Sequence, residues 1–136
     1  MQELEEGSDV SLDFEKLTAV GSGPSSVLPV VLQHAESDAV LFVGYANRQA
    51  LQETLARREA VLWSTSRNEL WHKGASSGDR LELVDVRVNC EQNSLLYRVL
   101  PRRDGVCHTR DAEGRTRKTC YYRRLESEAE LAFLEA

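Results

Sequence analysis

The sequence predicts an α+β fold: a small single domain of antiparallel strands with one or two helices. Three observations lead to this fold class. Several short apolar runs have the length of strands, one segment carries apolar residues at helical spacing, and 136 residues suit one domain. The hydrophobic content of 41% is enough for one core. A domain of this size buries roughly two thirds of the surface that its unfolded chain exposes, so the fold needs no disulfide framework.

The first elements are predicted to be a β-hairpin and a helix. Residues 27–33 and 39–45 are apolar runs, and the polar residues 36–38 between them indicate a turn. Asn47 is suited to cap a helix that runs through Arg58, because its side-chain oxygen can accept a hydrogen bond from the first turn. Four residues of this helix share one face at helical spacing: Ala50, Leu51, Thr54 and Leu55.

Strands and a short helix are predicted for the rest of the domain. Apolar runs, some of them alternating with polar residues, indicate strands over 60–65, 81–88, 94–100 and 119–123. Residues 127–134 suggest a short acidic helix. The chain therefore divides into an acidic arm and loop over 1–26, a domain over 27–125, and a short acidic C-terminal helix or tail over 126–136.

Charge is distributed unevenly along the chain. The net charge is −5, yet residues 98–124 contain nine Arg or Lys and three acids. A basic patch on an acidic protein favours a small anionic ligand over nucleic acid, which the rest of the surface would repel; the alternative is a solvated basic loop. No apolar run approaches the ~20 residues of a membrane span, and the N-terminus has no apolar signal core. We expect a cytoplasmic protein.

The three cysteines, Cys90, Cys107 and Cys120, are candidate metal ligands. An odd number argues against a disulfide scaffold, and a reducing compartment leaves thiolates available. Three thiolates and a water form an open zinc site, in which the pKa of the water falls to about 7. Because no CxxC pair is present, scattered buried cysteines are the alternative interpretation.

Two groups of residues flank these cysteines. His108 follows Cys107 and is the best candidate for proton transfer, although it could also be a ligand or a core histidine. If residues 89–93 continue the preceding strand, Asn89, Glu91 and Asn93 face away from Cys90. They would then form a second, oxygen-rich site behind the thiolate.

The stretch 63–78 is dense in hydroxyl groups, with basic residues and glycines between them. Such a segment can bind phosphate through side chains and backbone N–H groups, although the order of a Walker A loop is absent. The alternative is a polar surface loop. Together with the threonine after His108, it supplies the candidate substrate-binding residues Ser64, Ser66, Arg67, Trp71, Lys73, Ser76, Ser77 and Thr109.

Four segments between Val27 and Arg124 resemble the phosphoribosyl-AMP cyclohydrolase family. They are 28–31 with the following strand, 47–51, 63–78, and the set Cys90, Cys107-His108-Thr109 and Cys120-Tyr121. The resemblance implies an intertwined homodimer whose zinc is held by Cys107 and Cys120 of one subunit and Cys90 of the other. It also implies hydrolytic opening of the purine ring of N1-(5-phosphoribosyl)-AMP at the N1–C6 bond, an early step of histidine biosynthesis.

The chain departs from the family pattern at several positions. The family typically has Asp-Cys-Asp-x-Asp, whose aspartates bind magnesium, where this chain has Asn89, Glu91 and Asn93. We therefore expect magnesium to bind weakly or to arrive with the substrate. The loop 109–119 is longer here, Ala75 replaces an acid, and Thr65 stands where arginine is expected. The alternatives are a zinc hydrolase of another amidine or purine-like substrate, or a nucleotide-binding relative without turnover.

Overall fold

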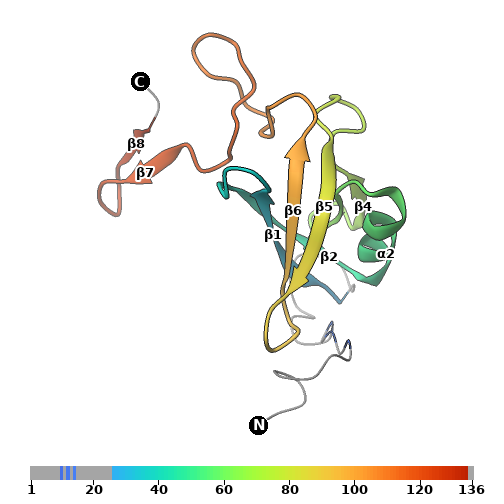
Figure 1. Ribbon diagram of the computed structural model, residues 1–136. Coiled ribbons are helices and arrows are strands. Elements are labelled where there is room, and N and C mark those ends of the chain that lie inside the picture. The colour runs from blue at the N-terminus through green and yellow to red at the C-terminus, as the bar shows by residue number, and fades with distance from the viewer. Residues whose placement is uncertain (1–9, 11, 13, 15–25, 135–136) are drawn as a thin grey trace.

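The computed structural model describes residues 10, 12, 14 and 26–134, and its centre is a four-stranded sheet (Figure 1). The strands lie in the order β2-β1-β6-β5. Their bounds are Leu28–His34 for β1, Val40–Ala46 for β2, Leu81–Val88 for β5 and Leu95–Pro101 for β6. The pairs β1–β2 and β5–β6 are antiparallel, whereas β1 and β6 pair in parallel. The sheet is thus two hairpins joined side by side.

One helix and a small second hairpin cover the sheet. Helix α2 spans Arg48–Arg57, and strands β3 (Val61–Ser64) and β4 (Glu69–His72) pair with each other. The Asn47 side chain accepts a hydrogen bond from the Ala50 N–H at 2.8 Å, which confirms the predicted N-cap. At ten residues, α2 is too short to cross a membrane, and no other helix occurs in the part of the chain described.

Burial in α2 follows the predicted face only in part. Ala50 and Thr54 are buried, whereas Leu55 is exposed. The Thr54 hydroxyl lies 2.9 Å from the Val61 carbonyl oxygen and accepts from the Val61 N–H at 3.0 Å. This polar contact fastens the helix to β3, where an apolar side chain would leave both backbone groups unpaired.

Alternating side chains of the central strands form the core. Val30, Leu32, Tyr97 and Val99 are fully buried, and Leu95 is nearly so. Burying such a side chain contributes about 1.5–3 kcal/mol to folding, so these strands carry much of the stability. Phe14 also joins the core, although most of the acidic arm lies outside the described residues.

The structure corrects the prediction for the C-terminal segment. The last strands are β7 (Arg123–Leu125) and β8 (Leu131–Phe133), an antiparallel pair, so both the helix over 127–134 and the strand over 119–123 are wrong. The rings of Tyr122 and Phe133 stack with their centroids 6.0 Å apart. The Arg117 guanidinium carbon lies 3.9 Å from the centroid of the Tyr122 ring. The stacking of the two rings across the hairpin outweighs the helical preference of the glutamates. Figure 1 shows this hairpin projecting from the sheet.

An ion cluster at Glu59 connects the small hairpin to the ends of β5 and β6. The Glu59 carboxylate lies 2.7 Å from His72 Nε2, and it accepts from Arg102 Nη2 at 2.9 Å. Its side chain is only 14% exposed. Burial opposes ionisation, but the hydrogen bond with His72 and the charges of Arg102, His72 and Arg80 outweigh it and lower the pKa of Glu59.

We expect Glu59→Gln to destabilise the fold near neutral pH by about 1–3 kcal/mol, because charge-assisted hydrogen bonds are lost. A folded-state pKa below the unfolded value gives stability that is present above the unfolded pKa and disappears as pH falls through the folded pKa. Urea unfolding near neutral pH and at about pH 3 should therefore show the difference between variant and parent shrinking in acid. An equal loss at both pH values would contradict this role.

Candidate active site

Two of the three cysteines lie together beside the free edge of β2. The Cys120 N–H donates to the Leu41 carbonyl at 2.8 Å, and the Cys107 N–H donates to the Arg117 carbonyl at 2.9 Å. The Cys107 and Cys120 thiols are hydrogen-bonded to each other. The loop between Cys107 and Cys120 therefore begins and ends at the same place, which brings two potential metal ligands together.

The surroundings of this thiol pair favour a single thiolate. The Thr109 hydroxyl lies 2.9 Å from Cys107 Sγ, and the Thr109 N–H donates to the same sulfur at 3.4 Å. Burial raises the pKa of Cys107, but these hydrogen bonds, that of Cys120 and the charge of Arg117 outweigh it and lower the pKa. Burial of the Cys120 thiol and the neighbouring Cys107 raise the pKa of Cys120 to about 12. Cys107 therefore ionises first.

Lys73 brings a positive charge to the thiol pair. It follows β4, its N–H donates to the Ala60 carbonyl at 3.2 Å, and the residue is buried. Burial lowers the pKa of Lys73, opposed by the charges of Asp79, Cys120 and Cys107. The next residue, Gly74, has a φ of +82°, and a Cβ there would lie 2.3 Å from the Arg80 backbone nitrogen. This turn, which requires glycine, holds the lysine in place.

Four of the candidate substrate-binding residues line a groove of about 340 Å³ at the β3–β4 hairpin: Ser64, Ser66, Arg67 and Trp71. The Ser64 hydroxyl accepts from the Arg67 N–H at 3.2 Å and lies 3.4 Å from the Ser66 hydroxyl. The stretch 63–78, whose composition suggests a polar loop, thus contains strand β4. The ring centroids of Trp71, on β4, and Phe42 lie 6.1 Å apart.

The remaining candidates separate into three places. Thr109 and Lys73 lie at the thiol pair, and His108 is exposed beside Cys107. Ser76 and Ser77 belong to an exposed turn after β4. The structure thus gathers Cys107, Cys120, Thr109 and Lys73. The Arg117 carbonyl accepts from the Cys107 N–H, and nothing in the sequence predicted this contact beyond the place of Arg117 in the basic stretch.

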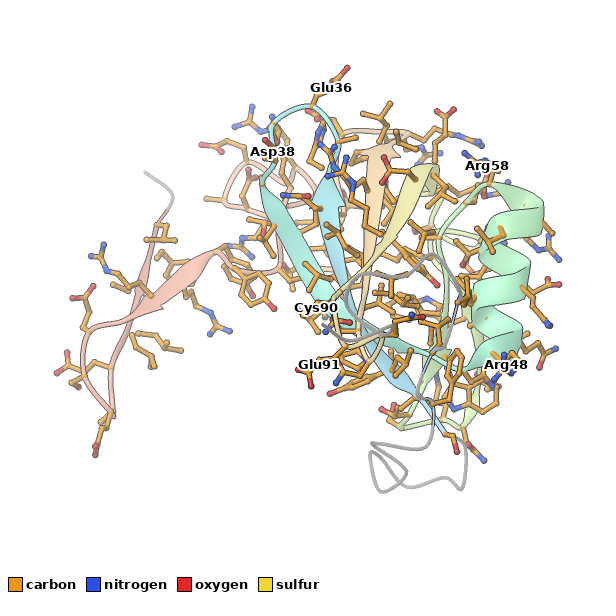
Figure 2. The ribbon with its side chains drawn as sticks, turned by 60° about the horizontal axis from the view of Figure 1, so that its bottom comes forward. Glu36, Asp38, Arg48, Arg58, Cys90 and Glu91 are labelled. Atoms are coloured by element: carbon orange, nitrogen blue, oxygen red, sulfur yellow. The ribbon has the colours of Figure 1, made fainter. Side chains whose placement is uncertain are left out.

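The third cysteine lies on the turn between β5 and β6. Strand β5 ends at Val88, as predicted, and Gln92 adopts a φ of 53°, so 89–93 do not continue the strand and do not place Asn89, Glu91 and Asn93 on one strand face. Asn89 Oδ1 accepts from the N–H groups of Asn93 and Ser94, each at 2.9 Å, and Asn89 Nδ2 donates to Asn93 Oδ1 at 2.7 Å. The amides therefore close the turn, and Figure 2 shows Cys90 and Glu91 on it.

Cys90 lies across the sheet from the other two cysteines of its own chain. The β5–β6 turn and the outer edge of β2 are separated by about three strand spacings, or roughly 14 Å. Zinc–sulfur bonds are only about 2.3 Å long, so one ion cannot bind all three thiols of one chain. Within residues 26–134 and the three described residues before them, no group of three His, Cys, Asp or Glu could hold a metal ion.

Comparison with known proteins identifies related sequences. Residues 42–122 match the family model described as phosphoribosyl-AMP cyclohydrolase. The phosphoribosyl-AMP cyclohydrolase of Sphingopyxis alaskensis is 39% identical over 110 residues, which cover 81% of this chain and 82% of the relative. That of Thioalkalivibrio sulfidiphilus is 37% identical over 110 residues, covering 81% and 79%.

A longer relative carries the same region. The histidine biosynthesis bifunctional protein HisIE of Thermus thermophilus is 41% identical over 119 residues, which are 87% of this chain. This chain spans about half of that relative, since the match covers 52% of it. The family match runs from Phe42, within β2, to Tyr122 and so contains the thiol pair, Lys73 and the β5–β6 turn. The chain therefore belongs to the phosphoribosyl-AMP cyclohydrolase family, whose curated members are hydrolases by name.

Proposed function

We infer that this chain is a phosphoribosyl-AMP cyclohydrolase of histidine biosynthesis, which hydrolyses the N1–C6 bond of the purine in N1-(5-phosphoribosyl)-AMP. We further propose that it acts as a homodimer in which Cys107 and Cys120 of one chain and Cys90 of the other hold zinc. The observation that carries the proposal is the pair of adjacent thiols beside a buried lysine, in a chain of this family.

The donor set supports zinc. Cysteine sulfur is a ligand that zinc prefers, and two thiols already lie side by side, with the Thr109 hydroxyl 2.9 Å from the Cys107 sulfur. Cys90 is exposed on a turn, where a second chain can reach it. Zinc bound there would act as a Lewis acid and lower the pKa of a coordinated water.

The residues around the thiols have separate roles in this proposal. An N1-substituted adenine is cationic at its amidine, so C6 is open to attack by water. His108, exposed next to Cys107, accepts the proton of the attacking water and returns a proton to N1 as the C–N bond breaks. Ser64, Ser66, Arg67 and Trp71 line the groove that would hold part of the nucleotide.

Turnover of phosphoribosyl-AMP by purified protein tests this function directly. Mass spectrometry should show a product heavier by one water, with the ring-opened aminoimidazole chromophore. AMP, which lacks the N1 substituent and its positive charge, is the matched control and should not react. Binding of phosphoribosyl-AMP without any product would favour a nucleotide-binding protein, and turnover of a different amidine alone would favour another hydrolase.

The residues in the place of the family's magnesium ligands do not fit that ion. The carbonyl oxygens of Asn89 and Asn93 are engaged in the hydrogen bonds of the β5–β6 turn, which leaves Glu91 as the one carboxylate there. At an effective dielectric near 20, each missing charge close to the ion removes several kcal/mol of attraction before desolvation is counted.

We therefore expect magnesium titrated into substrate-free protein to bind more weakly than about 10 µM by calorimetry. The double variant Asn89→Asp/Asn93→Asp should bind magnesium more tightly, because it restores two carboxylates. Binding by the parent tighter than about 10 µM would show that one carboxylate and two amides suffice. If binding is weak as expected, magnesium that matters for catalysis arrives with the phosphates of the substrate.

A further inference from the structure

A basic hollow of about 1010 Å³ lies beside the thiol pair, between the turn after β4 and the loop that joins Cys107 to Cys120. Five basic side chains line it: Arg103, Arg110, Arg115, Arg117 and Lys118. Three acids also line it: Asp79, Asp104 and Asp111.

The acids have cationic partners in the structure. Lys118 Nζ lies 3.1 Å from Asp104, and Asp111 accepts hydrogen bonds from the backbone of its own turn and lies 3.5 Å from Arg115 Nε. Asp79 interacts electrostatically with Lys73. Each acid of the hollow is therefore balanced by a cation other than Arg103 and Arg110.

Among the described residues, the side chains of Arg103 and Arg110 donate hydrogen bonds only to neutral groups. Arg103 Nη1 donates to the Ser77 carbonyl at 3.1 Å, and Arg110 Nη1 donates to the Gly114 carbonyl at 3.0 Å. A guanidinium has five N–H donors, so most donors of each remain for a ligand. The two charges are uncompensated by any acid among the described residues.

The backbone holds these two arginines in place before any ligand binds. Gly78 has a φ of +89°, and a Cβ there would lie 2.6 Å from the Arg103 guanidinium carbon, so the guanidinium packs directly against this glycine. Arg110 and Thr116 pair as a β-bridge, and a Cβ on Gly105 would lie 2.6 Å from Thr116. Fixed guanidinium groups lose little entropy when they bind phosphate.

The wall of the hollow is continuous with the thiol site. The Arg117 N–H donates to the Thr109 carbonyl at 3.1 Å, and the Arg117 carbonyl accepts from Cys107. A ligand with an anionic end in the hollow would therefore have its other end near the thiols.

We propose that this hollow binds a phosphate group of the substrate through Arg103 and Arg110, an assignment that rests on the proposed function. Arg110 belongs to the long loop 109–119, so the proposal gives that loop a role in substrate affinity. The ligand chemistry is a phosphomonoester on a ribose, of which the proposed substrate carries two.

The test uses ribose 5-phosphate as the probe, titrated into the full chain by calorimetry. We expect Arg103→Gln and Arg110→Gln each to raise its dissociation constant about tenfold or more, since each removes a charge-assisted hydrogen bond. Gly78→Ala should weaken binding as well, because it displaces the Arg103 guanidinium without removing a charge. The matched control is Arg57→Gln, an exposed arginine on α2, which should bind normally.

Circular dichroism and thermal unfolding of each variant show whether it is folded. Unchanged affinity in folded Arg103→Gln and Arg110→Gln would overturn the proposal, as would the absence of saturable binding by the parent. The readout is binding and not turnover, so the two proposals fail separately. If the parent does not hydrolyse phosphoribosyl-AMP but the two variants still lose binding of ribose 5-phosphate, the phosphate site stands and only the proposed function fails.

Discussion

Equal amounts of Cys90→Ser and Cys107→Ser protein, each inactive alone, should regain activity when their subunits are allowed to exchange. The reason is the separation of the thiols: Cys107 and Cys120 are adjacent, whereas Cys90 lies across the sheet on the β5–β6 turn. In a mixed dimer one site carries both lesions and the other carries neither. Random pairing makes half of the dimers mixed, so about a quarter of the parent activity should return.

The matched control mixes Cys107→Ser with Cys120→Ser. Both lesions then fall on the pair that one chain supplies, so every site of every dimer is damaged and no activity should return. Zinc content should follow the same pattern, with about one ion per chain in the parent and little in each variant alone. Recovery in neither mixture, with subunit exchange verified by native mass spectrometry, would argue against a shared site.

Much of the fold could be predicted because local signals specify it. The hydrogen bond of Asn47 to Ala50 is a contact within one helical turn, and the hairpin of β1 and β2 needs only a short polar turn. The parallel pairing of β1 with β6 had no such signal, because the strands are far apart along the chain and parallel partners leave no turn between them.

The failures of prediction have a common physical origin in contacts beyond the local pattern. The glutamates of 126–130 suggest a helix, yet Tyr122 and Phe133 stack across a hairpin. The sequence left open whether 89–93 continue the strand before them, and the Asn89 side chain, which accepts two backbone N–H groups, folds the segment into a turn.

The candidate site was predictable as a set of residues but not as an arrangement. Cysteine count and the neighbouring His-Thr pointed to the thiols, yet only the structure brings Cys107, Cys120 and Lys73 together. It also assigns Ser64, Ser66, Arg67 and Trp71 to one groove, and Ser77 to the basic hollow. Sequence spacing cannot distinguish these places because the β3–β4 hairpin reverses the chain between them.

His108→Ala is expected to lower the rate of ring opening by roughly 10²–10⁴-fold while zinc stays bound. Cys107 is buried and held by Thr109, whereas the next residue, His108, is exposed and its side chain makes no hydrogen bond within the part of the chain that the structure describes. An imidazole in that position can approach a substrate without giving up a structural contact. Its removal should therefore leave the fold and the thiol pair intact.

Single-turnover kinetics and zinc analysis of the same His108→Ala preparation separate the possible roles of this histidine. A proton-transfer group gives a slow chemical step at full zinc content, and added imidazole should restore part of the rate, because a free base can enter the space left by the side chain. A ligand gives loss of zinc, in which case the proton transfer proposed here is wrong. A surface histidine without a role gives a parental rate. Thr109→Val is the matched comparison: it removes the hydroxyl 2.9 Å from the Cys107 sulfur, so it should alter zinc affinity more than proton transfer, and imidazole should not restore its activity.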